Sequence, residues 1–247
     1  MKPKNSKAIS LIFLFASVLI QITAQTSLER NNLFDFGWRF HLGGAQGAED
    51  PAFDDSQWKK LDLPHDWSIE DLPGTDSPFH NNAISQVNGG FTTGGTGWYR
   101  KSFVVPIELK EKHFVILFEG VYMNAEIWLN GELIGDHPYG YTSFWFDITD
   151  KLKFDGENIL CVKVKNEGEN SRWYSGSGIY RHVWLQVVSP VHVATWGTYL
   201  TTPLIKEDEA LINIKTTIVN RSSENKRIKL VHLFWLQPLP KHLVKSD

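Results

Sequence analysis

Cysteine is nearly absent from this chain of 247 residues, because Cys161 is the only one. A single cysteine cannot form an internal disulfide, so the fold must be stabilised by a packed core. Positive charge is not in excess either: 25 Lys and Arg stand against 28 Asp and Glu, which gives a net charge of −3. Nucleic-acid binding relies on clustered Lys and Arg, so we expect no nucleic-acid partner.

Patterns typical of metal and phosphate sites are also missing from the sequence. The nine histidines are scattered, and His65, His137 and His182 have no partner at metal-ligand spacing. The glycine pairs Gly89-Gly90 and Gly94-Gly95 precede no helical pattern, so they do not form a phosphate-binding loop. We therefore expect no metal site and no cofactor.

Long apolar runs are missing except at the N-terminus. There, three lysines precede an apolar stretch over residues 9–22, and Ala24 offers a small residue for cleavage. This pattern predicts a signal peptide over residues 1–24 and export to the periplasm or the extracellular space. The stretch is too short and too often interrupted for a stable membrane span, although an uncleaved N-terminal anchor is the alternative. Cleavage would take the net charge to −6.

Helical periodicity is hard to find after residue 24, and short apolar runs separated by turn residues replace it. This is the pattern of an all-β sandwich. Asn130-Gly131 lies between two alternating apolar runs and predicts a two-residue hairpin turn. The runs expected to be strands of the first domain lie at 103–106, 114–121, 125–129, 133–134, 144–148, 160–164 and 183–187.

Two long irregular segments, residues 49–64 and 73–97, interrupt these strands. A loop as long as the second segment is usually functional or disordered in a compact domain, and a mobile insertion without a ligand is the alternative to a functional loop. Beyond Ser189-Pro190, alternating runs that start at Val191, Ile212 and Ile228 predict strands of a second sandwich. An immunoglobulin-like sandwich needs roughly 100 residues, so residues 189–247 are expected to form only part of one.

Residues 171–181 combine two arginines, three aromatic residues and two glycines. Arginine provides a planar fork of donors, and aromatic rings provide flat apolar faces. This combination suits a polyhydroxylated ligand with C–H faces and hydroxyl edges. A strand-connecting loop closed by a packed aromatic residue is the alternative.

Several ordered motifs resemble the N-terminal sugar-binding domain of family 2 glycoside hydrolases, most closely its β-galactosidase branch. In chain order they are FDDSQW (53–58), LPHDW (63–67), GWYRKSF (97–103), FEGV (118–121), IWLNG (127–131), GYTSF (140–144), FDIT (146–149) and GIYRHVWL (178–185). Together they cover about residues 33–188.

The resemblance implies a jelly-roll, galactose-binding-like β-sandwich over residues 25–188, followed by an incomplete immunoglobulin-like β-sandwich over 189–247. In the family a (β/α)₈ barrel follows and carries two catalytic glutamates about 5 Å apart. The chain ends before such a barrel, so we expect no catalytic residue and no activity from this chain alone. Glu167, which follows Asn166 as in the family's acid/base dipeptide, is interpreted as a solvated loop charge.

The resemblance also implies that the domain forms one wall of the sugar pocket, with a β-galactoside-like carbohydrate as partner. The implied substrate-binding residues are Asp66, Arg172, Trp173 and Tyr174. Arg172 stands near the position where some relatives have a cation-binding aspartate, which argues against a metal role. For Asp66 the alternative is a capping carboxylate beside Trp67, and Arg181 is interpreted as a structural residue paired with a buried acid. A stand-alone carbohydrate-binding or adhesion module, or a purely structural role, remains an alternative function, and no oligomeric state is predicted.

Overall fold

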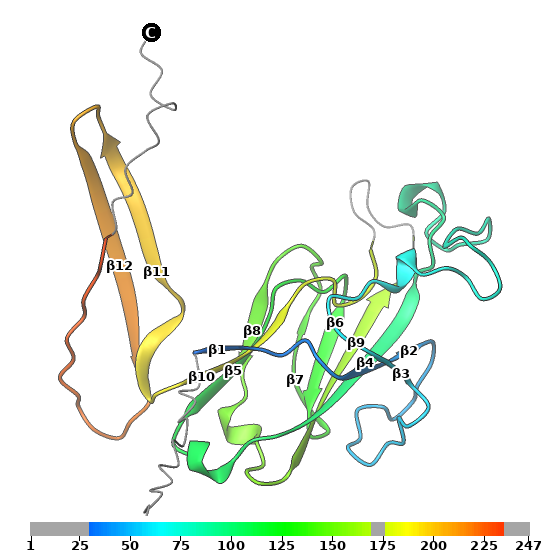
Figure 1. The fold of residues 1–247 in the computed structure, drawn as a ribbon, viewed down its shortest axis with the longest axis horizontal. Helices are drawn as coiled ribbons and strands as arrows, with labels where there is room; N and C mark the ends of the chain where they lie inside the picture. The colour runs from blue at the N-terminus through cyan, green and yellow to red at the C-terminus, as the bar shows by residue number, and fades with distance from the viewer. Residues whose placement is uncertain (1–29, 169–175, 235–247) are drawn as a thin grey trace, which may run out of the picture.

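The computed structural model describes residues 30–168 and 176–234, and two antiparallel sheets packed face to face dominate it (Figure 1). The four-stranded sheet contains, in spatial order, β1 (Asn31–Leu33), β10 (Val183–Val188), β5 (His113–Phe118) and β8 (Phe144–Asp147). The six-stranded sheet contains β3 (Lys59–Leu61), β2 (Trp38–Leu42), β4 (Gly95–Val104), β9 (Glu157–Asn166), β6 (Ala125–Leu129) and β7 (Glu132–His137). The short 3₁₀ turns are η1 (Trp67–Ile69), η2 (Val87–Gly89), η3 (Ile107–Leu109) and η4 (Thr149–Lys151). The predicted all-β sandwich is confirmed.

The main core lies between the two sheets. Phe114, Ile116 and Phe118 alternate along β5, and Leu160, Val162 and Val164 alternate along β9; all are buried in one cluster. Successive side chains of a strand point to opposite faces, so every second residue of each strand enters this core. The strand positions inferred from alternation at 160–164 and 183–187 are therefore confirmed.

A second, smaller cluster covers the outer face of the six-stranded sheet. It contains Trp98 and Cys161, and the loop that includes Phe53 and Trp58 packs over it. Burial raises the pKa of the Cys161 thiol to about 12, so this cysteine is an unreactive core residue. Two hydrophobic clusters, one between the sheets and one on the outer face of the six-stranded sheet, therefore provide the packed core that the sequence predicts.

The hairpin turn between β6 and β7 is the one that the sequence predicts. Leu129 pairs with Glu132, so the loop consists of Asn130 and Gly131 alone. Both residues have positive φ, 55° and 87°, as a type I′ turn requires.

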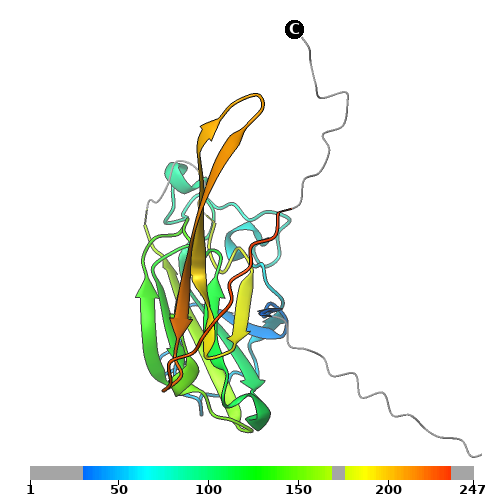
Figure 2. The same cartoon turned by 90° about the vertical axis from the view of Figure 1, so that its left-hand side faces the viewer.

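The chain continues into a long hairpin of β11 (Val191–Ile205) and β12 (Ala210–Asn220). It leaves the sandwich beside the four-stranded sheet (Figure 1), and Figure 2 shows that it extends beyond the sandwich. The strand predicted at 228–234 is wrong: these residues form no ladder, and their apolar side chains are exposed. Alternation alone does not make a strand, because an isolated two-stranded hairpin provides no buried face on which a third strand can pack. Over the described residues, no helix has the length and apolar character needed to cross a membrane.

Candidate functional site

Asp66 lies at the N-cap of η1, at one end of the sandwich. Its Oδ1 accepts hydrogen bonds from the Ser68 backbone N–H at 2.9 Å and from the Ser68 hydroxyl at 2.6 Å. The backbone N–H of Ser177 also donates to this oxygen, at 2.8 Å. One carboxylate oxygen thus ties η1 to the segment that leads into β10. The capping interpretation of Asp66 is confirmed, and a role toward sugar stays a prediction.

His65 adjoins Asp66 and joins three separate parts of the chain. Its Nδ1 lies 2.7 Å from the Tyr99 hydroxyl, and its Nε2 lies 3.0 Å from Oε1 of Glu70. Glu70 in turn forms an ion pair with Lys59. Burial lowers the pKa of His65, although the Glu70 carboxylate acts in the opposite direction. The imidazole is therefore a neutral bridge at pH 7 that holds the Asp66 loop in place.

Gly178 sets how closely the GIYRHVWL motif approaches this site. Its φ is +131°, and a Cβ there would lie 2.3 Å from the Tyr99 hydroxyl and 2.6 Å from the His65 carbonyl. Gly178 also exchanges two backbone hydrogen bonds with Tyr122, at 2.8 and 2.9 Å. Only glycine fits this close approach. The close approach to Tyr99 and His65 explains why the motif begins with glycine, which the sequence alone did not show.

The other three predicted site residues, Arg172, Trp173 and Tyr174, lie outside the described residues. The flanks of their segment are described. Asn166 is buried and donates from Nδ2 to the Ser177 hydroxyl at 2.8 Å. Both ends of the segment are therefore anchored beside Asp66.

The interpretation of Arg181 needs a correction. Its side chain is 55% exposed, and its Nε lies 3.6 Å from Oε2 of Glu119, which is itself only partly buried. The buried arginine that follows an aromatic residue on a strand and pairs with an acid is Arg100, after Tyr99 on β4, although its partner Asp55 is itself only partly buried. The two arginines differ in burial, and their local sequence does not predict this difference.

The segment from Ile69 to the start of β4 forms a folded loop beside Asp66. Phe79 bridges to Thr92, the backbone N–H of His80 donates to the Phe91 carbonyl, and η2 lies within the loop. Its exposed apolar side chains are Ile69, Phe79, Ile84, Val87 and Phe91. Glu167, at the other side of the same end, is exposed and accepts a hydrogen bond from Thr96, as expected of a loop charge.

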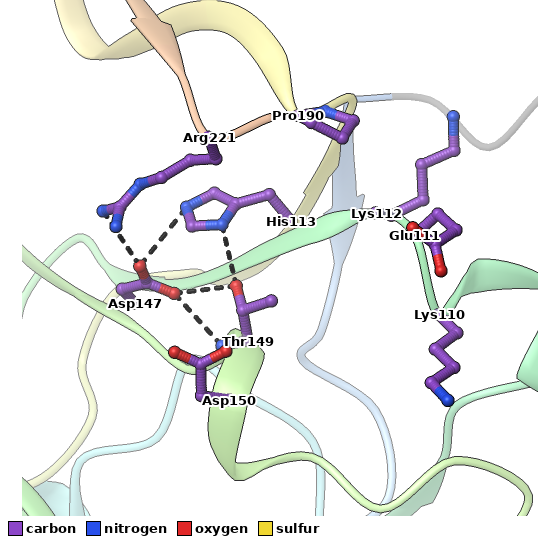
Figure 3. A pocket seen from close by; sticks show the side chains of 9 residues that line it. All are labelled: Lys110, Glu111, Lys112, His113, Asp147, Thr149, Asp150, Pro190 and Arg221. Atoms are coloured by element: carbon purple, nitrogen blue, oxygen red, sulfur yellow. Dashed lines mark hydrogen bonds and ion pairs between the residues drawn. The ribbon is translucent and has the colours of Figure 1, made fainter. Parts of the chain in front are cut away.

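An open pocket of about 300 Å³ lies where the hairpin joins the sandwich (Figure 3). Asp147 is at its centre: its Oδ2 lies 3.4 Å from His113 Nε2 and 3.2 Å from Arg221 Nη2. Its Oδ1 accepts from the Thr149 hydroxyl at 2.7 Å. The His113 ring also stacks on His192 of β11, with centroids 5.1 Å apart.

Burial lowers the pKa of His113, against the attraction of Asp147. At neutral pH the Asp147 carboxylate therefore pairs directly with the Arg221 guanidinium while the neutral His113 imidazole contacts the same oxygen, and the cluster fastens the hairpin to β5 and β8. Sequence reasoning missed it because these side chains come from four distant segments; the FDIT motif supplies Asp147 and Thr149, but nothing in it indicates His113, His192 or Arg221 as neighbours.

Two packed antiparallel sheets, with an anchored loop cluster at one end, define an all-β jelly-roll sandwich as the class of this protein. The profile described as Glycosyl hydrolases family 2, sugar binding domain matches residues 33–189. The chain belongs to this family.

Relatives of known name agree with this assignment. The β-galactosidase BoGH2A of Bacteroides ovatus is 49% identical over 196 residues, which are 79% of this chain and 22% of that protein. A β-glucuronidase of Formosa agariphila is 34% identical over 228 residues, 83% of this chain and 23% of that protein. A solved family 2 member from Bacteroides cellulosilyticus matches with a TM-score of 0.73 and 50% identity over 77% of this chain and 24% of that chain. The chain spans about a quarter of the length of these relatives.

Proposed function

We propose that this chain is the non-catalytic N-terminal portion of a β-galactosidase-like family 2 glycoside hydrolase, and that its Asp66 end forms one wall of the sugar pocket. The family match over residues 33–189 carries the proposal, together with the quarter-length coverage of both relatives. In the proposed protein, hydrolysis of the glycosidic bond belongs to a part that these residues do not include.

The loop beside Asp66 supports a role as a wall. Exposed apolar side chains such as Phe79, Ile84 and Val87 extend over one loop of the sandwich end. Contiguous exposed apolar surface marks interaction sites in soluble proteins. We infer that this loop packs against the catalytic part and so brings the Asp66 carboxylate to the pocket, where it accepts hydrogen bonds from sugar hydroxyls.

The direct test is a chimaera in which residues 33–189 replace the matching segment of the B. ovatus relative. We expect the chimaera to hydrolyse a chromogenic β-galactoside, whereas the present chain alone gives no turnover above background. Asp66→Asn keeps an oxygen for the Ser68 and Ser177 donors but removes the charge. This variant should lower kcat/KM of the chimaera by about tenfold, the effect of losing roughly 1.4 kcal/mol of transition-state binding.

The matched control is Asp54→Asn. Asp54 also caps a turn, because it accepts a hydrogen bond from the Ser56 backbone N–H at 2.9 Å. It lies, however, in the loop that covers the outer face of the six-stranded sheet and accepts hydrogen bonds from Arg100. This variant should leave kcat/KM unchanged. Equal values for the Asp66→Asn and unsubstituted chimaeras would exclude Asp66 from the sugar pocket, and turnover by the present chain alone would refute the non-catalytic assignment.

We also propose that the protein is exported, which the lysine-led apolar run over residues 1–24 supports. N-terminal sequencing of the chain recovered from the periplasm or medium should begin at Gln25. A chain that remains in the cytoplasm with Met1 in place would contradict this.

A further inference from the structure

The outer face of the four-stranded sheet carries an open groove with aromatic and polar walls. Residues paired across the sheet form two outward-facing rows, Leu33–Trp184–Leu117–Trp145 and Asn31–Gln186–Val115–Asp147. A pocket of about 390 Å³ lies over the β1 and β10 part of these rows. The residues of this Trp184 groove that matter here are Asn31, Glu119, Arg181, Trp184, Gln186 and Trp196.

Trp184 is held in one orientation on the groove floor. Its indole Nε1 donates to Oε1 of Glu119 at 2.9 Å, and the other carboxylate oxygen lies 3.6 Å from Nε of Arg181. The three side chains thus place an apolar ring next to a carboxylate and a guanidinium whose charges balance. A fixed ring beside hydrogen-bonding groups is a preorganised surface, which binds a ligand with less loss of conformational freedom.

Trp196 reaches the same groove from β11 through a distorted stretch of strand. The β11–β12 register shifts between Val193 and Thr198, and Trp196 has φ +53° within this bulge. A Cβ on the next residue, Gly197, would lie 2.9 Å from the Ala194 side chain and carbonyl oxygen, so the bulge closes only with glycine. Bulges re-aim side chains, and here the side chain is an indole that is 61% exposed.

The positive φ of Trp196 is unfavourable, and burial of its side chain does not offset this cost because the indole is mostly exposed. A bulky residue at positive φ costs of order 1–3 kcal/mol and persists where the surroundings require it, often at ligand sites. An exposed indole at positive φ lines the same groove as the fixed Trp184 indole, which points to a ligand that contacts both rings.

Two amides of the same lining complete the groove. Gln186 donates from Nε2 to Asn31 Oδ1 at 2.9 Å and accepts from the Thr195 hydroxyl at 2.7 Å. This chain of hydrogen bonds links β1, β10 and β11 and holds the Gln186 amide in place, while Asn31 is exposed. Pyranose rings have apolar C–H faces and polar hydroxyl edges, and this groove provides partners for both.

We propose that the Trp184 groove binds a neutral pyranose unit of an oligosaccharide. The sugar face stacks on the indoles, and its hydroxyls bond to Glu119 and to Asn31, which the buried Gln186 amide holds in place. A neutral sugar is favoured over a uronate because Arg181 already pairs with Glu119. The proposal goes beyond the function proposed above and shares no residue with the Asp66 wall.

The test uses the whole chain with 5-fluorotryptophan in place of its ten tryptophans, each ¹⁹F signal being assigned by single Trp→Phe substitutions. The probes are β-1,4-galactobiose and, as the charged counterpart, a digalacturonate. We expect the Trp184 and Trp196 signals to move saturably with galactobiose, with a Kd of about 1–10 mM. Digalacturonate should bind at least about tenfold more weakly, because one of its carboxylates would lie beside the carboxylate of Glu119 and the two would repel each other.

Trp196→Ala should weaken galactobiose binding by at least about tenfold without affecting the fold, because this indole is mostly exposed. Trp145→Ala is the matched control: it removes an exposed indole from the same outer row without touching the groove lining. Asp54→Asn, in the outer loop of the six-stranded sheet, should also leave the binding intact, and the sugar-pocket wall is tested separately in the chimaera. Signals that stay fixed up to about 100 mM galactobiose, or binding unaffected by Trp196→Ala, would overturn the proposal, and preferential binding of digalacturonate would overturn its neutral-sugar assignment.

Discussion

Replacing Arg100 with methionine tests how the outer loop of the six-stranded sheet is held. Arg100 is 2% exposed, and its Nε donates to Oδ2 of Asp55 at 2.9 Å. Its other nitrogens donate to carbonyl oxygens of the same loop, those of Ala48, Asp50, Pro51 and Phe53. Methionine fills similar space but donates to none of them, so buried acceptors lose their partner.

Removing one partner of a buried ion pair typically costs about 3–5 kcal/mol, because the other charge stays behind uncompensated. The Asp55 side chain is 22% exposed and can gain water, so we expect a loss near the lower end, about 3 kcal/mol. For a chain of this size, that corresponds to a fall in Tm of roughly 6–12 °C.

The assay is urea and thermal unfolding of the whole chain, followed by circular dichroism and tryptophan fluorescence. Arg39→Met is the matched control, because Arg39 pairs with the same carboxylate at 3.5 Å but is 32% exposed. A partly exposed pair of this kind, at a longer distance, contributes about 0–1 kcal/mol. Equal losses for the two variants would refute the reasoning that burial, rather than charge pairing itself, makes Arg100 important.

Three further predictions concern stability and solubility. Burial lowers the pKa of His65 below 6.5, so the unfolded chain binds more protons than the folded chain just below that pH. The free energy of unfolding, measured by urea unfolding at several pH values, should therefore fall as the pH is lowered from about 7 to about 5.5. The fall should be smaller in His65→Gln, and the same pH dependence in both proteins would contradict this. Gly178→Ala should lower Tm sharply or prevent folding, because its Cβ would overlap the His65 carbonyl, whereas Gly44→Ala, with no atom within 4 Å, should change Tm little. A chain ending at Val188 should stay monomeric in size-exclusion chromatography at concentrations where the full chain associates through the exposed apolar side chains of β11 and β12; similar elution would count against this.

Several elements of the fold follow from local sequence. Alternation at 160–164 and 183–187 indicates which side chains enter the core, because the strand period of two is a property of the backbone. Asn130-Gly131 predicts its turn because both residues tolerate positive φ. The same reasoning fails at 228–234, where the alternation is present but no sheet face is available to receive it.

The candidate site was predicted less completely. Asp66 was singled out by its motif, and the structure adds that its Oδ1 caps η1 and holds Ser177. The roles of Arg100 and Arg181 were not distinguishable from sequence, because each arginine follows a tyrosine. Their difference lies in the loop that covers one and leaves the other at the surface.

The sequence by itself determined the all-β class, the family and the positions of most strands, since these depend on short-range periodicity and ordered motifs. Only the tertiary structure placed Trp184 beside Trp196, Asp147 beside Arg221, and Gly178 against His65. Such pairs depend on sheet register and on the way loops cross the sheet ends. These are long-range arrangements, fixed when the whole core packs, and no local pattern of residues specifies them.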